Sequence, residues 1–275
     1  MTRAWERFWF RPESAATLAL LQIAVGLVVI AWALLLAPDL QTFYGVDGVV
    51  PGTRAAPVLL AALLLGGVAL AVGYRARLAA ALVFVSLAWL HRVDPWAMHA
   101  GDGLLRDLVF VLAIAPGGAR RSGGFPPRAP WAIRLVQLQI SVMYLAAVAA
   151  KLGGSTWRDG TAVSYPLRLP ELTRFAPPEW LTGSLAGAHV LTWGTLAVEA
   201  AIGLLVWSRR ARPWVLALGV ALHLSIDVTL RAGLFSWIVL AAYVAFVPPE
   251  RAERILLAAR RLPSVQAVPA AVRRR

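Results

Sequence analysis

Apolar runs long enough to cross a bilayer recur along most of this chain and are separated by short segments that carry arginine. The first run, residues 15–37, is uninterrupted by any charged side chain, and 59% of all residues are hydrophobic. A membrane-spanning helix needs about 20 predominantly apolar residues, so one such run already limits the choice of fold. The pattern predicts an all-α fold, a polytopic membrane bundle of about eight transmembrane helices, in place of a soluble enzyme.

The expected spans follow from the apolar runs and from the turn residues between them. They are residues 15–37, 58–72, 78–91, 96–116, 131–151, 188–207, 213–230 and 234–247. Residues 1–14 alternate arginine with aromatic residues and are expected to lie at headgroup level on the cytoplasmic side. Residues 15–247 form the bundle domain, and residues 248–275 form a basic cytoplasmic tail with an amphipathic stretch at 250–262.

Basic residues are divided unequally between the two sides of an eight-span chain. Of the 27 basic residues, nineteen fall on the side that holds both termini and eight on the other. Positive residues favour the cytoplasmic side, so we expect a cell-membrane protein with both termini in the cytoplasm. The same placement explains the net charge of +13 without nucleic acid as a partner. The absence of cysteine excludes disulfides and cysteine-ligated metal.

Lys151 is the only lysine in the chain, and it ends the apolar run that begins at Trp131. A guanidinium stays protonated, whereas a partly buried ammonium can lose its proton and act as a base. The alternative is that Lys151 only extends toward the membrane interface. Steps of three and four residues back from Lys151 meet a polar stripe that should face the bundle interior, formed by Tyr144, Ser141, Gln137 and Arg134.

Further polar side chains fall near the same predicted external end. His99, Asp102 and Arg106 share one face of a helix, where Asp102 could either pair with Arg106 or face a substrate. His223 and Asp227 lie one helical turn apart and could form a hydrogen-bonded pair or contribute to a metal site. No third ligand has a similar spacing, so no metal is predicted.

Two other segments favour an enclosed site. Residues 188–207 place His189, Thr192 and Glu199 on one face, and a carboxyl at the depth of Glu199 must be protonated or paired. The longest loop, residues 156–187, contains Trp157 and Trp180 and is expected to form an ordered cap at the interface.

The order of these motifs resembles the horizontally transferred transmembrane (HTTM) family, which is related to the vitamin K-dependent gamma-carboxylase. The matching stretches are WAMH at 96–99, YLAAVAAKLGGSTWRDG at 144–160 and LHLSIDVTLRAGLFSW at 222–237. The resemblance extends over nearly the whole chain. The lysine-leucine pair followed by W-x-D-G is its most specific part.

The resemblance implies a general base that deprotonates a lipophilic quinol of the vitamin K or menaquinol type. It assigns catalytic roles to Lys151, His99 and His223, and we expect Tyr144, Asp102 and Trp157 to bind the ligand. The chain departs from the carboxylase at Ala150, where that enzyme has a second lysine, and at Met98, where it has asparagine. The carboxylase's large lumenal domain is also absent, which argues against peptide carboxylation.

Two classes of function remain open from the sequence. In the first, Lys151 is a general base in an external pocket. In the second, the bundle is a non-enzymatic partner for maturation or export of a secreted peptide. A transporter would be expected to show internal repeats and paired broken helices, and neither is found. For the enzyme, we expect apolar surroundings at Lys151, with histidine nearer than any carboxylate.

Overall fold

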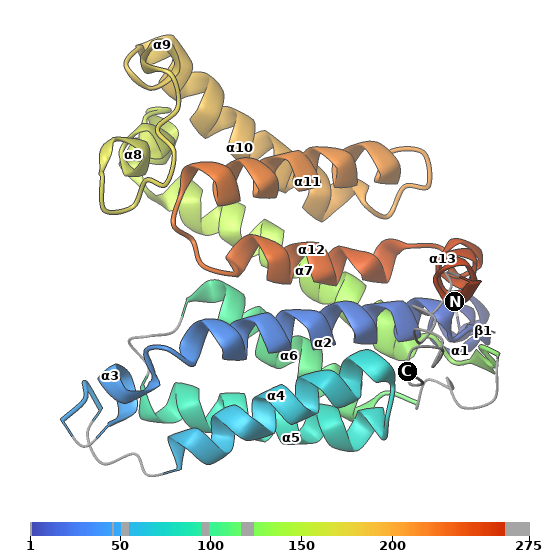
Figure 1. Ribbon diagram of the computed structural model, residues 1–275. Helices are drawn as coiled ribbons and strands as arrows, with labels where there is room; N and C mark the ends of the chain where they lie inside the picture. Colours follow the sequence, from blue (N-terminus) through green and yellow to red (C-terminus); the bar gives the residue numbers. More distant parts are fainter. Residues whose placement is uncertain (1, 46, 51–54, 95–98, 117–123, 262–275) are drawn as a thin grey trace, which may run out of the picture.

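The computed structural model describes residues 2–45, 47–50, 55–94, 99–116 and 124–261. Their architecture is helical, and the only sheet in these ranges is a two-residue pairing of β1 (Glu13–Ser14) with β2 (Pro127–Arg128). The predicted all-α class is therefore confirmed. The long helices run roughly side by side along one direction (Figure 1).

The first half of the chain forms a group of four neighbouring helices. They are α2 (Ala16–Leu36), α4 (Ala56–Val72), α5 (Ala76–Val93) and α6 (Ala100–Ile114), and each packs on the next. Glycine permits the close approach of α2 and α4, because a methyl group at Gly26 would lie 2.8 Å from the Gly67 carbonyl oxygen. Small residues at a helix crossing are typical of membrane bundles.

The second half adds α7 (Trp131–Gly153), α10 (Leu185–Leu205), α11 (Arg212–Thr229) and α12 (Phe235–Tyr243), which η3 (Val244–Phe246) extends. Helix α10 packs on both α7 and α11, while α12 lies against α11 and against α6 and α2 of the first group. Helix α12 therefore joins the two halves, and it occupies the middle of the bundle in Figure 1.

Short elements gather at the two ends of the bundle. One end holds α3 (Leu40–Tyr44), α8 (Ser155–Arg158), η1 (Ala162–Ser164), η2 (Pro166–Arg168) and α9 (Glu179–Thr182). The other end holds α1 (Thr2–Phe10), the β1–β2 pairing and α13 (Pro249–Arg261) (Figure 1). We call these the Lys151 end and the terminal end.

The expected number of spans is only partly supported. Within the described ranges, α2, α5, α7 and α10 are both long and apolar enough to cross a membrane. Helix α4 and the α12–η3 segment are apolar but shorter, and α6 has only 15 residues. The helices thus occupy the predicted places, but eight spans are not confirmed. The expected start of α6 near Trp96 lies outside the described residues.

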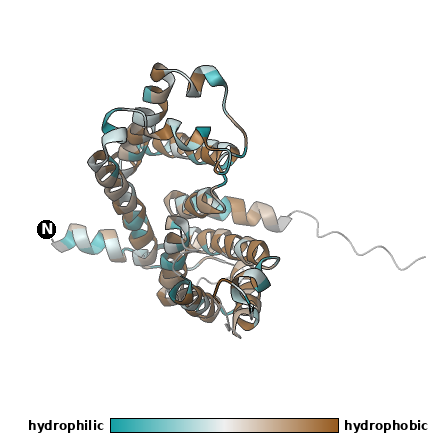
Figure 2. Ribbon diagram, turned by 90° about the vertical axis from the view of Figure 1, so that its left-hand side faces the viewer, coloured by the Kyte–Doolittle hydropathy of each residue, from teal (hydrophilic) through white to brown (hydrophobic). Residues whose placement is uncertain are grey.

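Hydrophobic residues dominate the long helices, whereas hydrophilic residues concentrate in α1 and in the connecting segments (Figure 2). Many large apolar side chains remain exposed on the outer helix faces, among them Leu65, Leu78, Val142 and Leu204. Exposed apolar faces on helices of this length fit contact with lipid. These features make the chain a membrane protein.

Candidate functional site

The side chain of Lys151 forms an ion pair with Glu199. Its Nζ donates to both carboxylate oxygens of Glu199, which lies on the neighbouring helix α10. The Lys151 side chain is 24% exposed and that of Glu199 is 11% exposed. The carboxyl of Glu199 is thus paired, as its depth on α10 requires. The ion pair therefore links α7 to α10.

Trp157 completes one side of this pair. After α7 ends at Gly153, the short helix α8 brings the Trp157 ring to 5.1 Å from Lys151 Nζ, within the range of a cation–π contact. The expectation that histidine lies nearer to Lys151 than any carboxylate is therefore wrong. A carboxylate beside an ammonium stabilises the charged form of both, because each supplies the counter-charge of the other.

A second group of polar side chains lies deeper between α7, α11 and α12. Tyr144 Oη lies 2.6 Å from His223 Nε2 and also hydrogen-bonds Tyr243 Oη. All three side chains are buried, and His223 Nδ1 has no hydrogen-bond partner among the described residues. Two of the residues expected in the site, Tyr144 and His223, therefore contact each other. Both Lys151 and Glu199 lie within electrostatic range of this group.

Glycine makes room for this tyrosine pair. A methyl group at Gly219 of α11 would lie 2.5 Å from Tyr243 Oη, so the absence of a side chain at this position lets the hydroxyl approach. A second glycine allows the loop after α8 to pack closely against aromatic side chains. Gly160 has a φ of +75° and its Cα faces the stacked rings of His189 and Trp193.

The other residues of the predicted polar stripe on α7 also have partners within the protein. Gln137 donates to the Ala245 carbonyl at 2.7 Å, and Ser141 accepts from Trp207 Nε1 at 2.9 Å. Arg134 pairs with Glu13 at 2.6 Å near the terminal end. Since Gln137, Ser141 and Tyr144 are all buried, the predicted polar stripe of this helix is confirmed.

His99 and Asp102 form a separate group at the start of α6. His99 Nδ1 accepts from the Gly101 backbone N–H at 3.1 Å, and Asp102 accepts from the His99 backbone N–H, which together make a capping box. Asp102 also accepts from Trp32 Nε1 of α2 at 2.8 Å. No ion pair with Arg106 and no contact with Lys151 is found within the described residues, so His99 and Asp102 act here as helix-capping groups.

Asp227 has a different partner from the one that its spacing suggested. It lies 3.8 Å from Arg174 of the long loop, whereas His223 is bonded to Tyr144. The two side chains therefore do not form a pair with each other. Across the described ranges, no group of three or more metal-ligating side chains is found.

The sequence did not point to the buried groups around Tyr44, which lies on α3 at the Lys151 end. Burial raises the pKa of Tyr44 to about 12, and the carboxylates of Asp94 and Asp102 add to this effect. His91 is also buried nearby, and neither ring nitrogen has a described hydrogen-bond partner. Residues 95–98, which include most of the WAMH motif, lie outside the described part of the chain.

Tyr243 was likewise missed, because it stands within the apolar sequence YVAF and shows no periodic polar pattern of its own. Glu199 was singled out as a residue that needs a partner, but its partner was not identified. Such a pairing depends on how α7 and α10 are rotated about their axes, which the sequence pattern of either helix alone leaves open.

Comparison with protein families gives one match, in which the family model described as HTTM domain matches residues 125–250. Comparison with curated proteins and with solved structures gives no match. The matched region contains Lys151, Trp157, Glu199, His223 and Tyr243, but not His99 or Asp102. It is narrower than the nearly full-length resemblance expected from the motifs.

Proposed function

Since residues 125–250 match the HTTM domain family model, we propose that this chain is an integral membrane enzyme that moves a proton on a lipophilic quinol at Lys151 and Glu199. One observation carries the proposal. The single lysine of the chain is held in a mostly buried ion pair beside an indole ring and a buried tyrosine–histidine group. Buried ionisable groups inside a membrane domain are costly and are generally retained for function.

The surroundings of the pair suit a ligand with an apolar body and a hydroxyl group. Trp157 offers an aromatic face beside the ammonium, and Leu152, which follows Lys151, is 48% exposed on the outer face of α7. His223 Nδ1 is a buried polar atom that lacks a described partner, and such atoms usually have one. A quinol hydroxyl would supply the missing hydrogen bond to this nitrogen.

Bound here, a quinol would supply an O–H group that becomes strongly reducing once its proton is lost. Glu199 is the carboxylate of the pair, and in the proposed step it would accept the proton of this O–H group. Lys151 is placed to hold a negative oxygen through its ammonium charge. We therefore assign the role of base to the Lys151–Glu199 pair in place of Lys151 alone. Tyr144 and His223 hold the inner side of the site, whereas His99 caps α6 outside it.

The charge distribution supports an eight-span arrangement of this enzyme, in which α4, α6, α11 and α12–η3 cross the membrane together with the four longer helices. The arginine-rich terminal end would face the cytoplasm, and the Lys151 end would face outward. The shorter helices could span because flanking arginines and tryptophans reach the interface and the bilayer thins locally.

Purified protein in lipid nanodiscs, supplied with vitamin K hydroquinone in air, provides the test. We expect oxidation of the quinol above the rate in empty nanodiscs, and we expect both Lys151→Arg and Glu199→Gln to abolish the difference. Glu179→Gln is the matched control, because Glu179 is an exposed carboxylate of α9. Co-purified quinone, measured by mass spectrometry, should fall in the same two variants.

The competing proposal is a non-enzymatic partner of a secreted peptide. It is favoured by exposed aromatic side chains of the long loop, namely Tyr165, Phe175 and Trp180. Under that proposal Lys151→Arg keeps the charge and retains function, whereas Ala at Phe175 and Trp180 removes it. Wild-type quinol oxidation equal to that of empty nanodiscs would exclude the enzyme.

A further inference from the structure

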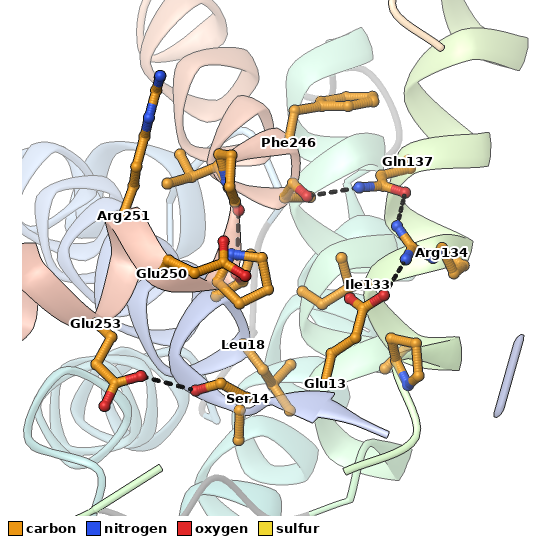
Figure 3. A pocket seen from close by; sticks show the side chains of 18 of the residues that line it. Glu13, Ser14, Leu18, Ile133, Arg134, Gln137, Phe246, Glu250, Arg251 and Glu253 are labelled. Atoms are coloured by element: carbon orange, nitrogen blue, oxygen red, sulfur yellow. Dashed lines mark hydrogen bonds and ion pairs between the residues drawn. The ribbon is translucent and has the colours of Figure 1, made fainter. Parts of the chain in front are cut away.

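A large cavity lies at the terminal end, away from Lys151. It has a volume of about 1120 Å³ and lies between the start of α2, the start of α7, the α10–α11 link, η3 and the start of α13 (Figure 3). Pairing of β1 with β2 closes one side of it. A space of this size exceeds what a single small ion needs and matches a ligand of drug size or larger.

Positive charge dominates the lining. Six arginines and three glutamates contribute to it, namely Arg11, Arg128, Arg134, Arg209, Arg212 and Arg251 with Glu13, Glu250 and Glu253. Arg134 is engaged by Glu13 and Gln137, and Arg212 donates to the Val206 carbonyl. Arg209 and Arg134 both lie within electrostatic range of Arg212, so like charges are crowded here.

Four of the arginines have no described partner for their charge. Within the residues that the structure covers, the side chains of Arg11, Arg128, Arg209 and Arg251 form no hydrogen bond or ion pair. Helix α7 also begins at this cavity without a side-chain cap, so its first backbone N–H groups need acceptors. Guanidinium groups and free helix N-termini both favour an anion.

The other part of the lining is apolar. Leu18, Ile133, Leu216 and Phe246 line the cavity from α2, α7, α11 and η3, the elements that lead into the hydrophobic interior. The cavity therefore presents arginines where the helices begin and apolar side chains farther in. This order matches a molecule with an anionic head and a hydrocarbon body, lying with its head at the level of the interface.

We propose that this cavity binds one anionic phospholipid, with its phosphate held by the arginines of the β1–β2 and α10–α11 segments and its acyl chains directed along the apolar wall. The site is separate from the Lys151–Glu199 pair. The arginines would also bind the phosphate of a soluble molecule, but the apolar wall of the cavity favours a lipid. Arginine suits this role because its planar fork binds two phosphate oxygens at once.

Native mass spectrometry of delipidated protein, titrated with phosphatidylglycerol and with phosphatidylcholine of the same acyl chains, tests the proposal. We expect one phosphatidylglycerol to bind more tightly than phosphatidylcholine. Arg128→Gln combined with Arg209→Gln should weaken this adduct by about tenfold or more. The matched control combines Arg92→Gln with Arg158→Gln, two exposed arginines at the Lys151 end, and should leave it unchanged.

A second variant keeps the arginines and fills the space. Ala129 lines the cavity and is partly buried, so Ala129→Trp should exclude the lipid without changing the charge. Equal weakening by both arginine pairs, or retention of the adduct in Ala129→Trp, would overturn the site. Displacement of the lipid by inorganic phosphate at equal concentration would overturn the lipid as its source. Thermal unfolding of each variant, measured alongside, shows whether the fold is intact.

Discussion

At the Lys151 end of the bundle, charged side chains face one another across helices, whereas at the terminal end several arginines surround a cavity without partners. Lys151 meets Glu199 and Arg174 meets Asp227, so these charges are compensated within the protein. Arg128 and Arg209 have no such partner in the described residues. A closed ion pair suits chemistry that the protein performs itself, while uncompensated charge suits recognition of an external anion.

The contrast between the Lys151 end and the terminal end requires that the two ends lie on opposite sides of the membrane. Ser155 and Ser208 are exposed residues at the two ends of the α7–α10 pair, and the chain has no cysteine of its own. In intact cells, a membrane-impermeant maleimide should label Ser155→Cys and leave Ser208→Cys unlabelled until the cells are opened. Labelling of both positions in intact cells would refute the eight-span arrangement.

Loss of one partner of the Lys151–Glu199 pair should give the largest change in stability. Lys151→Met leaves the Glu199 carboxylate largely buried and unpaired, so we expect the free energy of unfolding to fall by about 3 kcal/mol. The double variant Lys151→Met with Glu199→Leu should recover most of this loss. Chemical unfolding in detergent micelles measures both.

The Arg174–Asp227 pair provides the control for this prediction. Its nitrogen–oxygen distance is 3.8 Å and the Arg174 side chain is 43% exposed. Asp227→Asn should therefore cost less than about 1 kcal/mol. A cost as small as this for Lys151→Met would mean that water already compensates Glu199, and the contrast between a closed and an open end would disappear.

A smaller effect is expected from the glycine that accommodates Tyr243. Gly219→Ala places a methyl group 2.5 Å from Tyr243 Oη and should displace it from Tyr144, at a cost of about 1–3 kcal/mol. Adding Tyr243→Phe should reduce that cost. Gly194→Ala is the control, since open space surrounds that position in the middle of α10, and alanine there should be neutral or stabilising by up to about 1 kcal/mol.

The sequence predicts the helices better than the sites. Apolar runs locate α2, α7 and α10 because burial in lipid requires a continuous hydrophobic segment, and the stripe on α7 follows from helical periodicity alone. The number of spans does not follow from apolar composition alone, since α6 begins and ends within an expected span but has only 15 residues.

Pairings between helices could not be predicted in the same way. The contact of Lys151 with Glu199 depends on the rotation of α7 against α10, and the arginine-lined cavity draws on segments as far apart as Arg11 and Arg251. For His99, in contrast, the sequence predicted a chemical role where the structure shows a helix cap. Its spacing with Asp102 suggested chemistry, but the same spacing is that of a capping box, and the backbone uses both side chains.

The smallest predicted effect concerns Tyr44, which extends the comparison to the buried groups beside α6. The pKa of Tyr44 is raised from its ordinary value of 10.0 to about 12, chiefly by burial and further by Asp94 and Asp102. The folded state therefore keeps the phenolic proton at a pH where the unfolded chain has lost it. The stability that this proton contributes is complete below pH 10 and is lost as the pH rises toward 12.

Replacement of Tyr44 by phenylalanine removes this titration while keeping the ring. Between pH 10 and 12, the melting temperature of the wild type should fall more steeply than that of Tyr44→Phe, and the two curves should run parallel below pH 10. Tyr74→Phe is the control, because Tyr74 is 52% exposed and lies in the turn between α4 and α5. Parallel curves for wild type and Tyr44→Phe up to pH 12 would show that water reaches this phenol. The group around Asp102 would then be open to solvent, unlike the closed pair at Lys151.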